Sequence, residues 1–69
     1  MTVRELKEDI AFIMSHHPDR MDLYQWCFHG PHRLLANRQT LAGAGIHERD
    51  FILVKILPFS EARMRVPLG

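Results

Sequence analysis

Residues 37–57, NRQTLAGAGIHERDFILVKIL, are the most informative stretch for predicting the fold: a polar turn with two glycines runs directly into the most apolar stretch of the chain. Gly43 and Gly45 raise the question of a phosphate-binding loop. Such loops place their glycines between a strand and a helix, or follow them with a Lys-Ser or Lys-Thr pair. Here the glycines precede a strand and no such pair follows. The segment therefore predicts a turn in which the glycines allow positive φ and close packing.

The apolar stretch predicts a strand over about 51–57, which Pro58 ends. Alternation along a strand would place on one buried face Ile52, Val54 and Ile56. The opposite face would carry Phe51, Leu53, Lys55 and Leu57. That second face is unusually apolar for a surface in water, and exposed apolar patches tend to mark interfaces.

The N-terminal segment predicts a helix over residues 2–16. Thr2 and Glu5 have the spacing of a capping box, in which each side chain accepts a hydrogen bond from the other residue's backbone N–H. Pro18 disfavours helical geometry in the residue before it and so limits the helix. The stripe expected in the core consists of Val3, Leu6, Ile10, Ile13 and Met14. The residues expected on the other face are Arg4, Lys7 and Glu8.

Two further strands are predicted between these elements, at about 23–29 and 33–36. The side chains expected to point one way from the first strand are Leu23, Gln25 and Cys27, and those expected to point the other way are Tyr24, Trp26 and Phe28. Thr40 is placed to cap a single helical turn before the last strand. One helix followed by separate strands is an α+β pattern.

Length and composition limit the class of protein. A chain of 69 residues allows one small domain. Its formal charge of +1 produces no strong electrostatic attraction to nucleic acid or to an anionic membrane. The charged start of the chain contains no signal peptide, and no apolar run approaches the roughly 20 residues of a membrane helix. A single cysteine, Cys27, fits a reducing compartment. We therefore expect a soluble protein of the cytoplasm or nucleus, with no membrane partner.

Cys27, His29 and His32 are side chains of the kinds that bind zinc. They form one cluster without the second pair of ligands that structural zinc sites usually have, so histidines near a turn are the favoured interpretation and metal binding the alternative. The same residues lack an Asp or Asn placed to orient His29, and a chain of this size offers little room for a pocket. We predict no enzyme activity, no catalytic residues, no metal and no cofactor.

The basic side chains Arg33, Arg38, Arg49, Arg63 and Arg65 are scattered and balanced by acids. Nucleic-acid binding proteins carry a basic stripe, often with interleaved aromatic residues on one face. No nucleic-acid partner is therefore expected.

Three spaced signals resemble the ubiquitin-like family and together extend from Thr2 to about Leu57. They are the helix opening TVRELKEDI (2–10), the strand end WCFHG (26–30), and, most specifically, TLAGAGIHERDFILV (40–54). Within the family, MTVRELK, YQW and QTLAGAGI are similar to the ubiquitin-like domains of linear-ubiquitin ligase components. The resemblance implies a β-grasp fold over residues 1–57, with one helix packed on a mixed sheet.

The resemblance also implies that the family's opening β-hairpin is missing, because this chain starts at the helix. The first strand of that hairpin lies beside the strand equivalent to 51–57, which would otherwise expose a long apolar edge. Three explanations stay open. In the first, the chain is a fragment or variant. In the second, the tail 58–69 fills the gap as an extra strand; if it does not, we expect it to be a disordered end. In the third, a second chain pairs with the exposed edge of strand 51–57, as in a homodimer.

The family's docking surface is the solvent face of the sheet, and the matching positions here are Cys27, His29, Gly30, Leu53 and Lys55. The implied function is noncovalent docking to protein partners such as ubiquitin-binding domains, ligase subunits or scaffolds of the ubiquitin pathway. The alternative is a modifier conjugated through Gly69, although the chain ends in RVPLG and conjugated members end in Gly-Gly.

Overall fold

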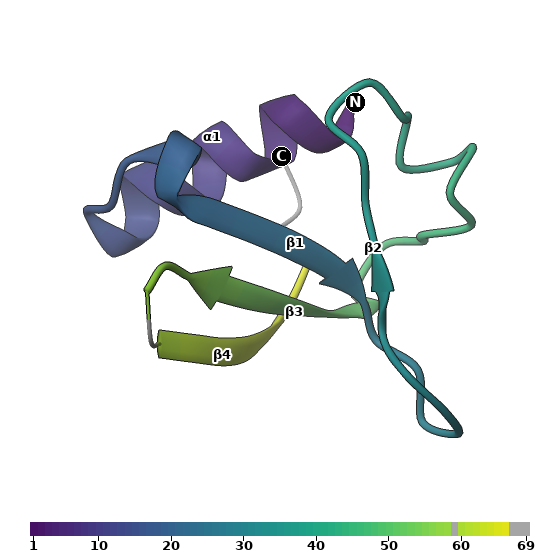
Figure 1. The fold of residues 1–69 in the computed structure, drawn as a ribbon. Helices are drawn as coiled ribbons and strands as arrows, with labels where there is room; N and C mark the ends of the chain where they lie inside the picture. Colours follow the sequence, from purple (N-terminus) through teal and green to yellow (C-terminus); the bar gives the residue numbers. More distant parts are fainter. Residues whose placement is uncertain (59, 67–69) are drawn as a thin grey trace.

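The computed structural model describes residues 1–58 and 60–66 (Figure 1). Its elements, in chain order, are the helix α1 (Val3–Met14), the 3-10 helix η1 (Pro18–Arg20) and the strands β1 (Met21–Gln25), β2 (Arg33–Leu34), β3 (Phe51–Ile56) and β4 (Ser60–Arg65). The strands form one sheet in the order β2-β1-β3-β4. The protein is thus an α+β domain with one helix and a four-stranded sheet.

Every strand pair in the sheet is antiparallel, so the expectation of a mixed sheet is wrong. The physical reason is that β1 and β2, and likewise β3 and β4, follow each other in the chain as reversing pairs, while the segment between β2 and β3 crosses over and brings β3 back beside β1 in the opposite direction. β3 returns alongside β1, and β4 follows β3 after a short turn (Figure 1).

The tail contributes a strand to the sheet. β4 pairs with β3 along its whole length, from Phe51 opposite Arg65 to Ile56 opposite Ser60. Val66 follows and is buried in the core. Of the three explanations left open for this edge of β3, the structure shows that the tail occupies it, and the folded unit extends beyond the predicted boundary at residue 57 to Val66.

Two predicted strands are too long. The strand expected at 23–29 begins earlier, at Met21, and ends at Gln25, while the one expected at 33–36 is only Arg33–Leu34. Pairing stops after Gln25 because the backbone N–H of Cys27 donates instead to Nδ1 of His32, at 2.9 Å. The loop between β1 and β2 then projects beyond the end of the sheet (Figure 1).

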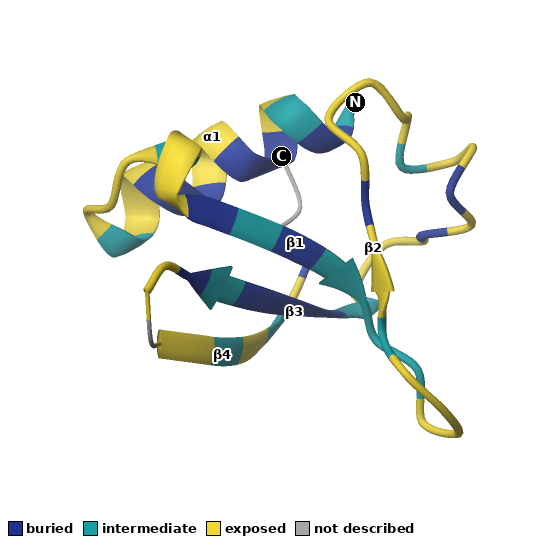
Figure 2. Ribbon diagram, viewed as in Figure 1, coloured by how far each residue is buried: buried dark blue, intermediate teal, exposed yellow. Residues whose placement is uncertain are grey.

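The core lies between α1 and the face of the sheet that α1 covers (Figure 2). The predicted burial of alternate β3 residues is confirmed, because Ile52, Val54 and Ile56 are all buried. The buried hydrophobic side chains that complete this core are Val3, Leu6, Ile10, Ala11, Met21, Leu23, Leu35, Ala44, Ile46 and Val66.

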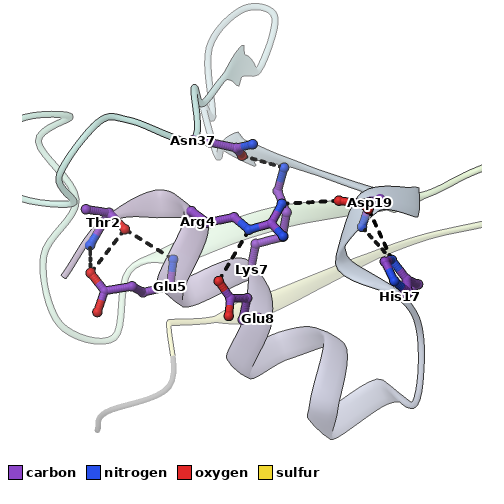
Figure 3. Close-up of polar contacts among 8 residues, drawn as sticks. All are labelled: Thr2, Arg4, Glu5, Lys7, Glu8, His17, Asp19 and Asn37. Atoms are coloured by element: carbon purple, nitrogen blue, oxygen red, sulfur yellow. Dashed lines mark hydrogen bonds and ion pairs between the residues drawn. The ribbon is translucent and has the colours of Figure 1, made fainter.

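Two helix positions differ from the prediction. Ile13 was expected in the core but is 59% exposed, whereas Lys7 was expected on the outer side but is only 7% exposed. The buried face of α1 includes Lys7 and Ala11 and excludes Ile13. Compared with the predicted stripe, the buried face is therefore rotated about the helix axis toward Lys7 and Ala11. The Lys7 ammonium donates to the side-chain oxygen of Asn37 at 2.7 Å, which satisfies one of its donors (Figure 3).

The glycine-bearing turn has the predicted role. The hydroxyl of Thr40 accepts a hydrogen bond from the Gly43 N–H at 2.9 Å, so Thr40 does cap a single turn. A Cβ at residue 43 would lie 2.8 Å from that hydroxyl, which explains the glycine by close approach. Gly45 has φ +77°, a conformation that side chains disfavour. The turn is held to the N-terminus because the Val3 N–H donates to the Gln39 carbonyl at 2.8 Å.

Both halves of the predicted capping box are present at the start of α1. The Glu5 N–H donates to the Thr2 hydroxyl at 3.2 Å, and the Thr2 N–H donates to the Glu5 carboxylate at 3.1 Å (Figure 3). The helix ends at Ser15, whose own N–H donates to carbonyls of the last turn. The left-handed conformation of Ser15 (φ 59°) turns the next N–H, that of His16, back to the Ala11 carbonyl at 3.0 Å.

The capping box makes a prediction about pH. Hydrogen bonds from the Thr2 backbone N–H and then the Thr2 hydroxyl lower the pKa of Glu5 from its ordinary value of 4.5. A carboxyl with a lowered folded-state pKa stabilises the fold above the unfolded pKa, and this contribution is lost as pH falls through the folded value. Comparing urea unfolding of the wild type with Glu5→Gln should therefore show a smaller difference in stability in acid than at neutral pH. An unchanged difference across that range would contradict this role for Glu5.

Candidate functional site

One face of the sheet is covered by α1, and the opposite face, here called the outer face, bears a different set of side chains. Residues directly opposite each other in neighbouring strands project to the same side of a sheet. Since Met21 and Leu23 point into the core, Asp22 and Tyr24 point to the outer face. The strand register then assigns to the outer face Asp22, Tyr24, Leu34, Phe51, Leu53, Lys55, Glu61, Arg63 and Arg65.

The outer face is organised by cations stacked on aromatic rings. The Arg63 guanidinium carbon lies 4.6 Å from the centre of the Phe51 ring and 5.3 Å from that of the Trp26 ring. The Arg65 guanidinium lies 4.8 Å from the Phe51 ring, and Nζ of Lys55 lies 5.2 Å from the Tyr24 ring. Such contacts are attractive, because the ring faces carry partial negative charge. They hold long basic side chains flat against the sheet.

Trp26 is positioned by the loop that follows β1. Its ring stacks against His32, with ring centres 4.3 Å apart, and meets the edge of Phe28 at 6.2 Å. His32 is itself fixed, because its Nδ1 accepts the Cys27 N–H. The indole N–H of Trp26 is buried and has no hydrogen-bond partner among residues 1–58 and 60–66. This loop therefore adds an aromatic wall to the sheet.

Two surface depressions meet at Trp26. One, of about 360 Å³, is lined by Trp26, His32, Leu53, Lys55, Glu61, Ala62 and Arg63. The other, of about 340 Å³, is lined by Gln25, Trp26, Phe28, Ile46, Arg49, Asp50 and Phe51. Both combine aromatic and basic side chains, a composition typical of the energetically important parts of protein interfaces.

The structure divides the five predicted docking residues into two groups. Leu53 and Lys55 lie on the outer face, in the centre of the sheet. Leu53 is only 8% exposed, because Tyr24 and Arg63 flank it on the neighbouring strands. It therefore forms the floor of the outer face and offers little surface for direct contact.

The other three predicted docking residues lie in the loop between β1 and β2. His29 and Gly30 are exposed and Cys27 is half-buried. This loop projects beyond the sheet (Figure 1), and neither His29 nor Gly30 lines the depression that contains Leu53. Gly30 has φ +119°, which favours glycine at this turn.

Sequence reasoning did not include Trp26, Phe51, Arg63 and Arg65 in the site. A signal was present, because Phe51 lies on the predicted second face of its strand and the tail alternates arginines with apolar residues. What could not be deduced is that β4 lies beside β3, which brings the arginines over the rings.

The structure also bears on the metal-binding alternative and on membrane-spanning helices. Among the residues that the structure describes, no group of three or more His, Cys, Asp or Glu side chains is arranged to hold a metal ion. Gly69, the residue of the conjugation alternative, lies outside the described residues. Within the described chain, no helix has the length and apolar character needed to cross a membrane.

Comparison with known proteins adds no assignment: no family model, no curated protein and no solved structure matches the chain.

Proposed function

We propose that this protein is a noncovalent protein-interaction module of the ubiquitin-like, β-grasp class, and that its partners dock on the outer face of the sheet. The observation that carries the proposal is this face itself, which bears aromatic and stacked basic side chains and is covered by no other described element. The resemblance in sequence suggests partners in the ubiquitin pathway, such as ubiquitin-binding domains or ligase subunits. Such partners would place the protein in the cytoplasm or nucleus.

The arrangement of elements supports the β-grasp part of the proposal. α1 lies across one face of the sheet, and β3, which carries the most specific resemblance, is a central strand. β4 occupies the flank of β3 at which the family's first strand lies. It does so in the antiparallel direction, and this is a departure from the family's mixed sheet.

The chemistry of the outer face supports docking. Burying part of an aromatic ring against a partner removes a large apolar area from water, at about 25 cal/mol per Å². Leu34, which lies in the same row as Tyr24 and Leu53, is 57% exposed and provides further apolar area at one edge of the face. The stacked arginines are already ordered, so less side-chain entropy is lost when they bind a partner.

The proposal predicts that partners can be captured from the outer face and not from the helix. A photo-crosslinking amino acid at position 34, introduced in cells, should give discrete protein adducts after irradiation. The matched control is position 12, because Phe12 is also apolar, is 88% exposed and lies on α1. Mass spectrometry of both samples identifies the adducts.

Point variants then measure the contribution of the face. Leu34→Asp should weaken binding of the identified partner about tenfold or more, because it places a charge in an apolar contact. Phe12→Asp should leave the affinity unchanged. Equal adducts from both positions, or equal effects of both variants, would reject docking on the outer face. Covalent adducts through Gly69 without irradiation would indicate a conjugated modifier instead.

A further inference from the structure

β4 forms one edge of the sheet. In the order β2-β1-β3-β4 it has β3 on one side, and among residues 1–58 and 60–66 no strand pairs with its other side. A strand edge presents unpaired N–H and C=O groups, to which an extended chain can add as a further strand. At six residues, β4 is long enough to pair with such a segment.

The hydrogen-bond register shows which β4 residues face this free edge. The Val66 N–H donates to the Asp50 carbonyl at 2.8 Å, so residues 50 and 66 form a hydrogen-bonded pair. Hydrogen-bonded and non-hydrogen-bonded pairs alternate along an antiparallel ladder. The residues whose backbone groups point away from β3 are therefore Glu61, Arg63 and Arg65.

The pairing on the other side of β3 agrees with this register. The Leu57 N–H donates to the Arg20 carbonyl at 2.8 Å, so the backbone groups of Lys55 and Leu53 point toward β1. Those of Val54 and Ile52 consequently point toward β4. The free backbone groups of β4 thus belong to residues whose side chains lie on the outer face.

Two of the three outer-face side chains along this edge are basic, and the third, Glu61, lies at the other end of the strand opposite Lys55. Arg63 and Arg65 are exposed, lie two residues apart on the same face, and form no ion pair with any described residue. Stacking on Phe51 orders both guanidinium groups while leaving N–H donors for a bound carboxylate. Positions two apart on a strand are separated by about 7 Å, which is also the spacing of alternate residues in an added strand.

We propose that the free edge of β4 binds an extended acidic segment of a partner protein as a fifth strand, with carboxylates at alternate positions that pair with Arg63 and Arg65. This inference rests on the proposed function, for which it names the partner's chemistry. A basic segment would be repelled by the two arginines. A second copy of β4 offers a single carboxylate, that of Glu61, for two arginines, and so matches the charge pattern less well.

The test is a titration of the ¹⁵N-labelled protein with synthetic six-residue peptides, matched in length to β4. The probe alternates Asp and Val. Its control, called the grouped peptide, has the same composition in the order Asp-Asp-Val-Val-Asp-Val, in which no two Asp residues are two positions apart. The alternating peptide should bind about tenfold or more tightly than the grouped one, because only it places carboxylates opposite both arginines. The largest amide shifts should occur at Glu61, Arg63 and Arg65, whose N–H groups would be hydrogen-bonded.

Two changes separate backbone pairing from simple charge attraction. Two N-methylated versions of the alternating peptide are compared, one methylated at the odd-numbered residues and one at the even-numbered residues. Only one of the two should lose binding, because only alternate N–H groups of an added strand face β4. Arg65→Glu should weaken binding about tenfold or more, while Arg38→Glu, the same charge change in the exposed turn after β2, should not. Circular dichroism would show that both variants are folded.

Each other outcome has a defined meaning. Equal binding of the alternating and grouped peptides, or no binding of either, overturns the acidic-strand inference. Shifts confined to the Trp26 and Phe51 neighbourhood also overturn it, since the peptide would then lie on the face instead of the edge. A doubling of molecular mass with shifts at the β4 amides would identify a second copy as the occupant. In all of these cases crosslinking from position 34 still decides the proposed function independently.

Discussion

A chain ended after Leu57 should fail to form a stable fold, although it contains every residue that resembles the ubiquitin-like family. The truncation removes β4 and with it the whole hydrogen-bonded ladder on one side of β3. It also removes Val66 from the core and leaves the apolar strand β3 as a sheet edge, which favours aggregation. A domain of this size has only about 3–5 kcal/mol of stability to lose.

Far-UV circular dichroism and size-exclusion chromatography provide the measurement. The truncated chain should show no cooperative thermal transition, or should elute as aggregates. A chain ended after Val66 is the matched control, because it keeps all described strands and core residues, and it should melt cooperatively. If the shorter chain melted like the full one, β4 would be an accessory strand and the folded unit would end near residue 57 after all.

Leu6→Ala should leave most of the protein unfolded at room temperature. Leu6 is fully buried between α1 and the sheet, and truncating such a leucine costs about 2–5 kcal/mol through lost transfer energy and the cavity left behind. This cost is of the same size as the whole stability expected for so small a domain, about 3–5 kcal/mol. The urea midpoint should therefore fall to near zero denaturant.

Two variants control this result. Phe12→Ala removes a larger side chain from the same helix, but one that is 88% exposed, so its effect should stay within about 0.5 kcal/mol. Leu6→Met keeps the volume and should cost less than about 1.5 kcal/mol. If Leu6→Ala and Phe12→Ala had similar effects, α1 would not pack on the sheet in the observed orientation.

The elements themselves could be predicted because their signals are local. The capping box at Thr2 and Glu5, the alternation of β3 and the cap at Thr40 each involve residues within a few positions of one another. The end of β1 was missed because it depends on a contact between Cys27 and His32 across a loop. The length of a strand depends on which backbone segments pair with it, and those segments are distant in the sequence.

The candidate site was predicted in part. The apolar outer side of β3 is visible in the sequence, and alternation along the strand places Leu53 and Lys55 together on one face of the sheet. Alternation alone could not show that Leu53 is buried there, because its cover comes from Tyr24 and Arg63 on two other strands. The same limit applies to Arg65, whose place over Phe51 follows from the β3 and β4 register.

Local sequence patterns were sufficient to predict one small α+β domain, in which a capped helix and an apolar strand supply much of the core. These features follow from local backbone preferences and from the need to bury apolar side chains. Three features became visible only in the folded structure: the antiparallel sheet, the position of the tail beside β3, and the burial of Lys7 in place of Ile13 on α1. The physical reason is that each of these features depends on contacts between segments that are distant in the sequence. Local sequence patterns do not show which of the possible pairings is the most stable.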